Sequence, residues 1–123
     1  MPNYVIAYLG GKQMPNPQDR AAHMARWKAW VDELGRAMVN PGTPLGQGKL
    51  VSSGGVSERG PNHLTGFSIV LADNMDAALE IAQRCPFLDI GTIEVAEEME
   101  IDIYNEVRVR VLAARVQVTP GSS

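Results

Sequence analysis

The chain has 123 residues, 45% of them hydrophobic, which is enough for one core and too few for two ordinary domains. Its formal net charge of -3 and its isoelectric point near 5.3 argue against nucleic acid as a partner, because nucleic-acid binders carry a basic face. The first apolar run, Tyr4 to Leu9, is far shorter than a membrane span and lacks the basic start and cleavage site of a signal peptide. We therefore expect no membrane association and a cytoplasmic location. The single cysteine, Cys85, excludes an intrachain disulfide and a cysteine-rich metal site.

The first 39 residues predict a strand, a helix and the start of a second strand. Residues 4–9 are rich in strand formers and end at two glycines. The helix runs from about Gln18 to Leu34, and Gly35 is well placed as its C-cap. The apolar stripe expected on this helix consists of Met24, Trp27, Val31 and Leu34, with Trp30 beside it.

Residues 40–66 hold seven of the twelve glycines and three of the eight prolines, so they predict a series of turns joined by short extended pieces. Residues 49–52 and 56–59 can pair as an irregular hairpin across residues 53–55. Residues 66–72 predict a stronger strand that leads directly into a second helix.

Residues 73–98 predict a helix, an abrupt stop and a last strand. Asp73 or Asn74 can cap the helix, and Pro86 forbids its continuation past Cys85. The apolar positions expected on one helix face are Met75, Ala78, Leu79 and Ala82, and Ile93 and Val95 alternate with polar residues in the strand. The complete order predicts an α+β, ferredoxin-like split β-α-β fold with an inserted hairpin, in which two helices cover one face of an antiparallel sheet.

The other face of such a sheet would be open to water, and the strand around residue 69 has no consistently polar side. We therefore expect a second copy of the chain to cover it, in a homodimer or a higher oligomer.

A C-terminal extension, residues 99–123, follows this domain of residues 1–98. Val107, Val109 and Val111 alternate with arginines, which favours extended structure. A helix over residues 103–116 is the competing interpretation, because residues 112–115 have good helix propensity. We expect the extension to pack on the domain or on a neighbouring subunit, and the last residues, 120–123, to fray.

The runs ALEIAQRCPF…GTIEV and WKAWVDELGRAMV resemble the YCII-related domain family, in particular its DGPF-like branch, and this resemblance covers most of residues 4–98. It implies a dimeric α+β barrel, in which two copies pack sheet to sheet. It also implies a fold like that of muconolactone isomerases and related dehydrochlorinases.

His23 is the first candidate for chemistry, as an acid/base group that borders the apolar stripe of the first helix. The resemblance implies the same role, since YCII-type proteins place a histidine early in this helix. The alternative is a half-exposed histidine that caps or packs. Asp19, four residues before His23, can orient the ring, although a carboxylate in a first turn also simply complements the helix dipole.

Cys85 stands where many YCII-type relatives carry an aspartate before Pro-Phe, so an Asp–His pair is not carried over to this chain. A helix C-terminus raises the pKa of a thiol, and we expect a buried, inert cysteine. A reactive thiol near His23 is the alternative.

Three further side chains are candidates for substrate binding: Tyr8, Arg59 and His63. Residues 59–62 read Arg-Gly-Pro-Asn, so the Asp-Gly-Pro-Phe signature of the branch is only half kept. The two histidines lack the close partners of a zinc site, and no phosphate loop or dinucleotide fingerprint is found. We therefore expect no metal and no cofactor.

The sequence leaves three functions open. The first is a cofactor-free isomerase or lyase acting on an unidentified small molecule, with His23 as acid/base. The second is a non-catalytic dimeric module that binds a ligand or another protein. The third is a structural assembly protein that uses the C-terminal extension.

Overall fold

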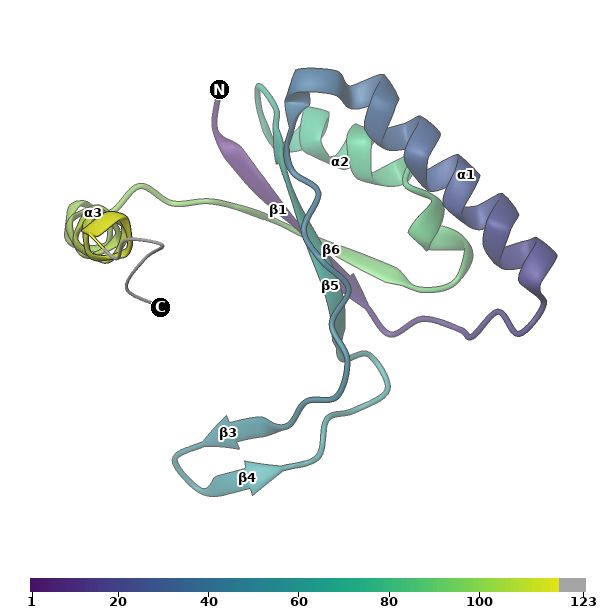
Figure 1. Cartoon of the computed structure of the whole chain (residues 1–123), viewed down its shortest axis with the longest axis horizontal. Coiled ribbons are helices and arrows are strands. Elements are labelled where there is room, and N and C mark those ends of the chain that lie inside the picture. The colour runs from purple at the N-terminus through teal and green to yellow at the C-terminus, as the bar shows by residue number, and fades with distance from the viewer. Residues whose placement is uncertain (118–123) are drawn as a thin grey trace.

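The computed structural model describes residues 1–117. A four-stranded antiparallel sheet forms the centre of the molecule, with strand order β2-β5-β1-β6. Its strands are β1 (Asn3–Leu9), β2 (Met38–Asn40), β5 (Leu64–Leu71) and β6 (Thr92–Glu97). Helices α1 (Pro17–Leu34) and α2 (Met75–Gln83) cover one face of this sheet (Figure 1). This is the α+β ferredoxin-like fold that the order of elements predicts.

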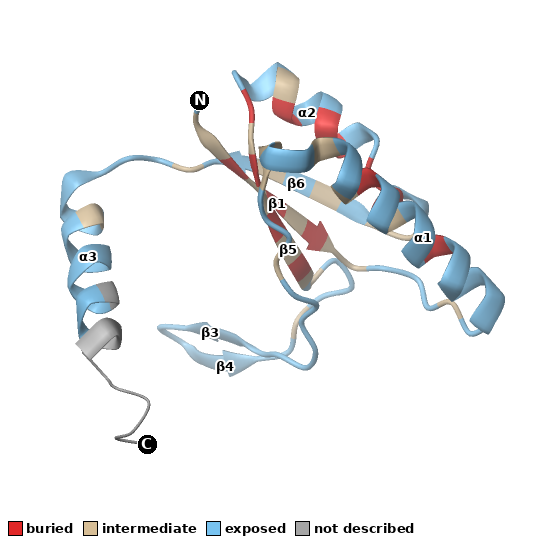
Figure 2. Ribbon diagram, turned by 45° about the horizontal axis from the view of Figure 1, so that its top comes forward, coloured by how far each residue is buried: buried red, intermediate tan, exposed pale blue. Residues whose placement is uncertain are grey.

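The two faces of the sheet differ in burial. Along β1, Tyr4, Ile6 and Tyr8 point towards the helices and are buried, while the alternate residues are half-buried on the other face. Ser68 and Val70 continue the buried face on β5. Buried residues therefore concentrate between the sheet and the two helices (Figure 2).

Helix α1 begins after Asn16, whose side chain accepts a hydrogen bond from the backbone of Gln18. It ends at Gly35, where a φ of 55° favours glycine. The predicted stripe is wrong in one position, because Met24 is 61% exposed and His23 is buried in its place. The residues of the helix that face the core are 23, 27, 30, 31 and 34.

Helix α2 begins after Asn74, whose side chain accepts from the backbone of Ala77. Its buried residues are Ala78, Ile81 and Ala82. The expectation that Met75 and Leu79 belong to the buried face is wrong, since both are exposed. The indole N–H of Trp30 donates to the carbonyl of Ile81 at 3.1 Å and so ties α1 to α2.

Short 3-10 turns follow both helices, η1 (Gly35–Ala37) and η2 (Pro86–Asp89). The inserted hairpin consists of β3 (Leu50–Ser52) and β4 (Gly55–Ser57), with a tighter turn than predicted. All of its residues are exposed, and it projects away from the sheet (Figure 1).

The C-terminal extension forms a helix, α3 (Asp102–Gln117), so the extended structure favoured from the valine alternation is wrong for these residues. A strand needs a neighbouring strand for its backbone hydrogen bonds, whereas a helix satisfies them within itself. No such neighbour lies beside this segment in the described part of the chain. Val118 and the residues expected to fray, 120–123, lie outside the described residues.

Candidate functional site

A cavity of about 320 Å³ lies at one end of the sheet, between α1, the loop 41–44 and η2. Its walls are largely aromatic. The rings of Tyr8 and Trp27 lie 5.1 Å apart and those of Tyr8 and Phe87 lie 5.0 Å apart, in edge-to-face and tilted arrangements. The side chains that define its chemistry are those of Tyr8, His23, Trp27, Thr43 and Phe87.

His23 is the polar side chain in this cavity that lacks a partner. Its exposed fraction is only 7%, and its Nδ1 atom is fully buried with no hydrogen-bond partner among the described residues. Leaving a buried polar atom unpaired typically costs about 1–3 kcal/mol. The ring that carries this atom lines the cavity, so the imidazole is placed to interact with a ligand there.

Tyr8 lines the cavity, and its hydroxyl is hydrogen-bonded to Ser68, which does not line it. The hydroxyl lies 2.7 Å from the Oγ of Ser68, and Ser68 Oγ donates to the Pro41 carbonyl at 2.9 Å. A serine hydroxyl has one proton, so Tyr8 must be the donor to Ser68. Burial raises the pKa of Tyr8 above its usual range, which keeps this hydroxyl protonated.

Cys85 lies beside the hydroxyl of Tyr8. The thiol is buried, as expected, and does not line the cavity. Burial raises its pKa to about 11, although a hydrogen bond from the backbone of Phe87 and the Tyr8 hydroxyl both oppose that shift. The thiol is therefore not part of the cavity beside His23.

Neither nearby aspartate reaches His23. Asp19 is exposed in the first turn of α1, and the only buried nitrogen of His23 has no partner within residues 1–117. Asp89 instead pairs with Arg26 at 2.5 Å. The structure thus does not bring a carboxylate to the histidine ring.

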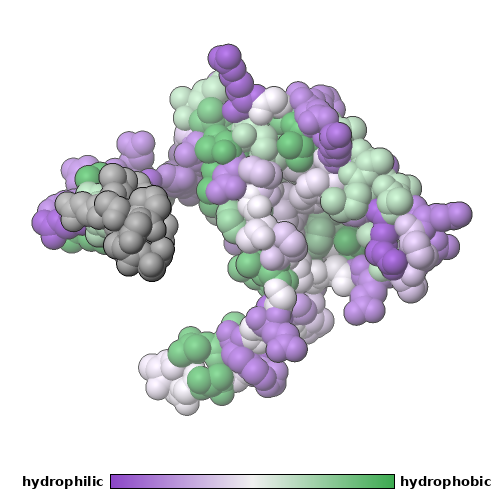
Figure 3. All heavy atoms as spheres, viewed as in Figure 1, coloured by the Kyte–Doolittle hydropathy of each residue, from purple (hydrophilic) through white to green (hydrophobic). Residues whose placement is uncertain are grey.

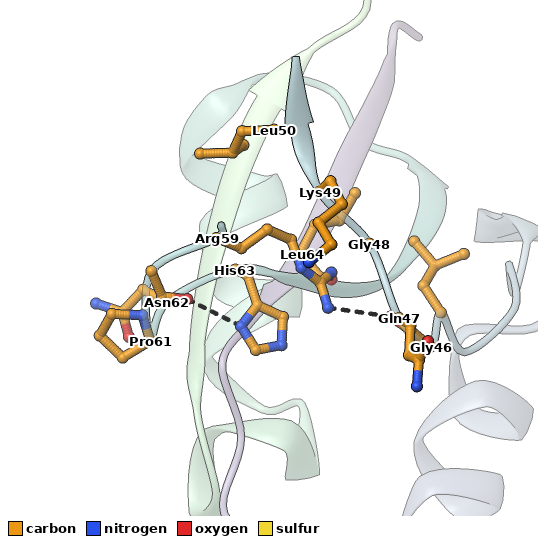
Figure 4. A pocket seen from close by; sticks show the side chains of 12 residues that line it. Gly46, Gln47, Gly48, Lys49, Leu50, Arg59, Pro61, Asn62, His63 and Leu64 are labelled. Atoms are coloured by element: carbon orange, nitrogen blue, oxygen red, sulfur yellow. Dashed lines mark hydrogen bonds between the residues drawn. The ribbon is translucent and has the colours of Figure 1, made fainter. Parts of the chain in front are cut away.

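Arg59 and His63 line a different hollow, of about 700 Å³, at the base of the β3–β4 hairpin (Figure 4). Both side chains bind backbone carbonyls there: Arg59 those of Gly46 and Leu64, and His63 that of Gly60. These contacts hold the loop, and the hollow has no buried unpaired polar side chain among its lining residues. The two residues are therefore not brought together with His23 or Tyr8.

Sequence reasoning missed Ser68, Phe87 and the loop 41–44 as parts of the site. Ser68 carries a usable signal, because it is a hydroxyl at a buried position of an apolar strand and so requires a hydrogen-bond partner. The loop carries no such signal, since its position depends on contacts with β5 that are distant in sequence.

Residues 1–117 show neither a metal-binding cluster nor a membrane-spanning helix. No group of three or more histidine, cysteine, aspartate or glutamate side chains is arranged to hold a metal ion in that range. Within the same range, no helix has the length and apolar character needed to cross a bilayer.

Comparison with known proteins identifies the family. Among solved structures, the chain is similar to 5-chloro-2-hydroxyhydroquinone dehydrochlorinase from Burkholderia phenoliruptrix AC1100, in complex with 2,5-dihydroxybenzoquinone. The TM-score is 0.51 at 19% sequence identity, over 80% of this chain and 95% of that one, and at this identity the likeness shows the fold. No curated protein matches the sequence. The model of the YCII-related domain matches residues 4–102, and the chain therefore belongs to the YCII-related domain family.

Proposed function

We propose that the chain is a cofactor-free lyase or isomerase for a small, planar, oxygen-bearing ring compound, with His23 as the acid/base group. The observation that carries this proposal is that His23, a buried histidine whose Nδ1 has no hydrogen-bond partner within residues 1–117, lines an aromatic cavity. A histidine kept only for packing would be expected to satisfy that nitrogen within the protein.

The shape and chemistry of the cavity support the class of ligand. Its volume of about 320 Å³ is at the small end of the range for ligand sites. Flat aromatic walls favour a planar ring, which can stack against them. The similar dehydrochlorinase was solved with 2,5-dihydroxybenzoquinone, which is itself a planar, oxygen-bearing ring.

The part of the reaction assigned to His23 is proton transfer. His23 accepts a proton from a carbon or hydroxyl of the substrate, and the electron pair left behind forms a new C=C or C=O bond. In a lyase, a leaving group on the adjacent carbon departs with its bonding electrons. In an isomerase, an existing double bond of the substrate breaks and gives its electron pair to another atom, and His23 returns the proton to that atom.

The test uses the two histidines as a matched pair, because they line different hollows. His23→Phe keeps a ring of similar bulk and removes both nitrogens, and His63→Phe is the control. We expect 2,5-dihydroxybenzoquinone to bind the wild type and the control alike, and His23→Phe at least tenfold more weakly, as for the loss of about 1.4 kcal/mol.

The same variant, His23→Phe, tests whether His23 is needed for the stability of the fold. Removing an unpaired buried nitrogen should leave the free energy of unfolding unchanged or raise it by about 1 kcal/mol, measured by urea denaturation. A His23→Phe variant that binds the quinone as tightly as the wild type would remove His23 from the site.

A non-catalytic binding module is the second candidate, favoured by Cys85 at the position of the family aspartate and by the absence of a carboxylate beside His23 within residues 1–117. The two functions differ in whether the bound ring compound is converted to a product. Chloride release from 5-chloro-2-hydroxyhydroquinone by the wild type, lost in His23→Phe, supports the lyase. Tight quinone binding without turnover of any tested ring supports the module.

A second copy of the chain is proposed as the cover for the open face of the sheet. Side chains on that face are apolar and half-buried: Val5, Ala7, Leu9, Phe67, Ile69 and Leu71. A sheet face of this composition requires a partner surface, and the resemblance to the family implies sheet-to-sheet pairing.

A further inference from the structure

Helix α3 has a stripe of exposed apolar side chains. At 100° per residue, one side of the helix carries Ile103, Tyr104, Val107 and Val111. These four side chains are between 47% and 67% exposed. Apolar side chains are not confined to this stripe, because Val109 on the opposite side of the helix is exposed as well.

The helix is also too weak to persist alone. It has 16 residues, close to the length at which isolated helices are marginal in water. Its valines and isoleucine lower its intrinsic propensity further. Its described ion pair to the rest of the chain, Arg108 to Glu98 at 3.5 Å, is exposed and contributes little.

The total surface of the chain points to a large missing partner. A compact monomer of 13.3 kDa exposes roughly 6,500 Å², whereas this chain exposes 9070 Å². The six terminal residues outside the described range account for at most roughly 800 Å² of that difference. The excess that remains, roughly 1,800 Å² per copy, is within the range buried by each subunit of an obligate homodimer.

The surfaces that lack a partner lie on one side of the molecule. Helix α3 and the β3–β4 hairpin both stand on the side of the sheet opposite α1 and α2 (Figures 1 and 2). Hydrophobic side chains appear along the sheet on that side and again on the hairpin (Figure 3), where Leu50, Val51 and Val56 are exposed.

We infer that α3 is an arm that docks, through the stripe formed by Ile103, Tyr104, Val107 and Val111, onto a second copy of this chain. This inference rests on the proposed sheet-to-sheet dimer and adds a second contact region to it. The match to the family ends at residue 102, so the arm belongs to this chain and not to the part that the family model describes.

A second copy explains the open surfaces better than folding of α3 back over its own sheet. A helix is about 10 Å wide and so covers about two strands spaced about 4.8 Å apart. One helix would leave half of this four-stranded face open, whereas the sheet of a second copy matches it entirely. Backfolding would also occupy the face that the second copy needs.

The first experiment changes the stripe in the full-length chain. Val107→Glu combined with Val111→Glu places charges on the stripe, and Val109→Glu is the matched control, because Val109 is 65% exposed and lies on the opposite side of α3. By sedimentation velocity, we expect the double variant to raise the dimer dissociation constant by about tenfold or more and the control to change it less than about twofold. Equal effects of the two, or no effect of either, overturn the inference.

A second experiment separates docking on a partner from backfolding. Benzoylphenylalanine at position 107 is photolysed in a mixture of isotope-labelled and unlabelled chains. Crosslinked peptides that combine both labels support the arm, and crosslinks that always carry a single label overturn it. The cavity beside His23 lies on the other side of the sheet from α3. A wild-type chain that forms the dimer through α3 but does not bind the quinone would therefore count against the proposed function alone.

Discussion

At the scale of single residues, the hydroxyl of Tyr8 links the wall of the cavity to the core. It donates to Ser68, which donates in turn to the carbonyl of Pro41 in the loop beside the cavity. The Tyr8 ring also packs against Trp27 and Phe87. Tyr8 thus holds both the aromatic wall of the cavity and, through Ser68, the loop 41–44.

Tyr8→Phe tests this link. The variant keeps the ring contacts and removes the hydrogen bond to a fully buried serine, so we expect the free energy of unfolding to fall by about 1–2 kcal/mol in urea denaturation. Tyr4→Phe is the control on the same face of β1, because no hydrogen bond to its hydroxyl is found within residues 1–117. Equal losses in the two variants would contradict the assigned hydrogen bond.

Cys85 predicts a dependence of stability on pH. Its pKa is raised from about 9 to about 11 in the folded chain, so above the lower value the unfolded state releases a proton that the folded state retains. The contribution of the thiol to stability is therefore complete below about pH 9 and is lost progressively as the pH rises towards about 11.

We measure urea denaturation of the wild type and of Cys85→Ala at about pH 8 and at about pH 10.5. The other titrating groups are shared by the two proteins, so the difference between them isolates the contribution of the Cys85 thiol to stability. We expect the stability advantage of the wild type to shrink at the higher pH. An advantage that stays constant would mean that the thiol has an ordinary pKa.

At the scale of elements, the loop 41–44 forms the wall of the cavity opposite α1. It is held by the bond from Ser68 to Pro41 and by a bond from the backbone of Leu45 to Thr65. Gly42 lies at a φ of 75° against the backbone of Phe67, so a Cβ there would collide with the Phe67 carbonyl. Only glycine fits at this position.

Gly42→Ala should therefore displace the loop, lower the free energy of unfolding by about 1–3 kcal/mol and weaken quinone binding. Gly46→Ala is the control, because its added methyl group would meet open space; we expect a change within about 0.5 kcal/mol. Thermal unfolding and a binding titration measure both effects. A Gly42→Ala variant that binds normally would show that the loop is not part of the site.

Local signals predicted the elements of residues 4–98 well, because caps, glycines and prolines act within a few residues of where they stand. The rotation of α1 was harder to predict, since burying His23 in place of Met24 contradicts the usual preference for apolar cores. The bond between Tyr8 and Ser68 spans 60 residues of sequence, so no local pattern indicates it. Helix α3 was mispredicted because its valines alternate as in a strand while also forming a helical stripe.

At the scale of the whole molecule, the uncovered face of the sheet is the basis of the proposed dimer. One layer of helices leaves an apolar sheet face uncovered, and we predict that Ile69→Lys, in the centre of that face, shifts the protein from dimer to monomer. Leu79→Lys, at an exposed position of α2, is the control and should leave the dimer intact. Light scattering coupled to size exclusion measures both masses. A dimer that survives Ile69→Lys would place the interface elsewhere.

The central claim is that His23 faces a small-molecule ligand in the aromatic cavity. Its most direct test is the long-range nitrogen–proton spectrum of the two histidine rings, assigned with the His23→Phe and His63→Phe variants and recorded as 2,5-dihydroxybenzoquinone is added. We predict a saturable shift of the His23 nitrogens and no shift of those of His63. A saturable shift of His63 with His23 unchanged, or no shift of either ring, would contradict it.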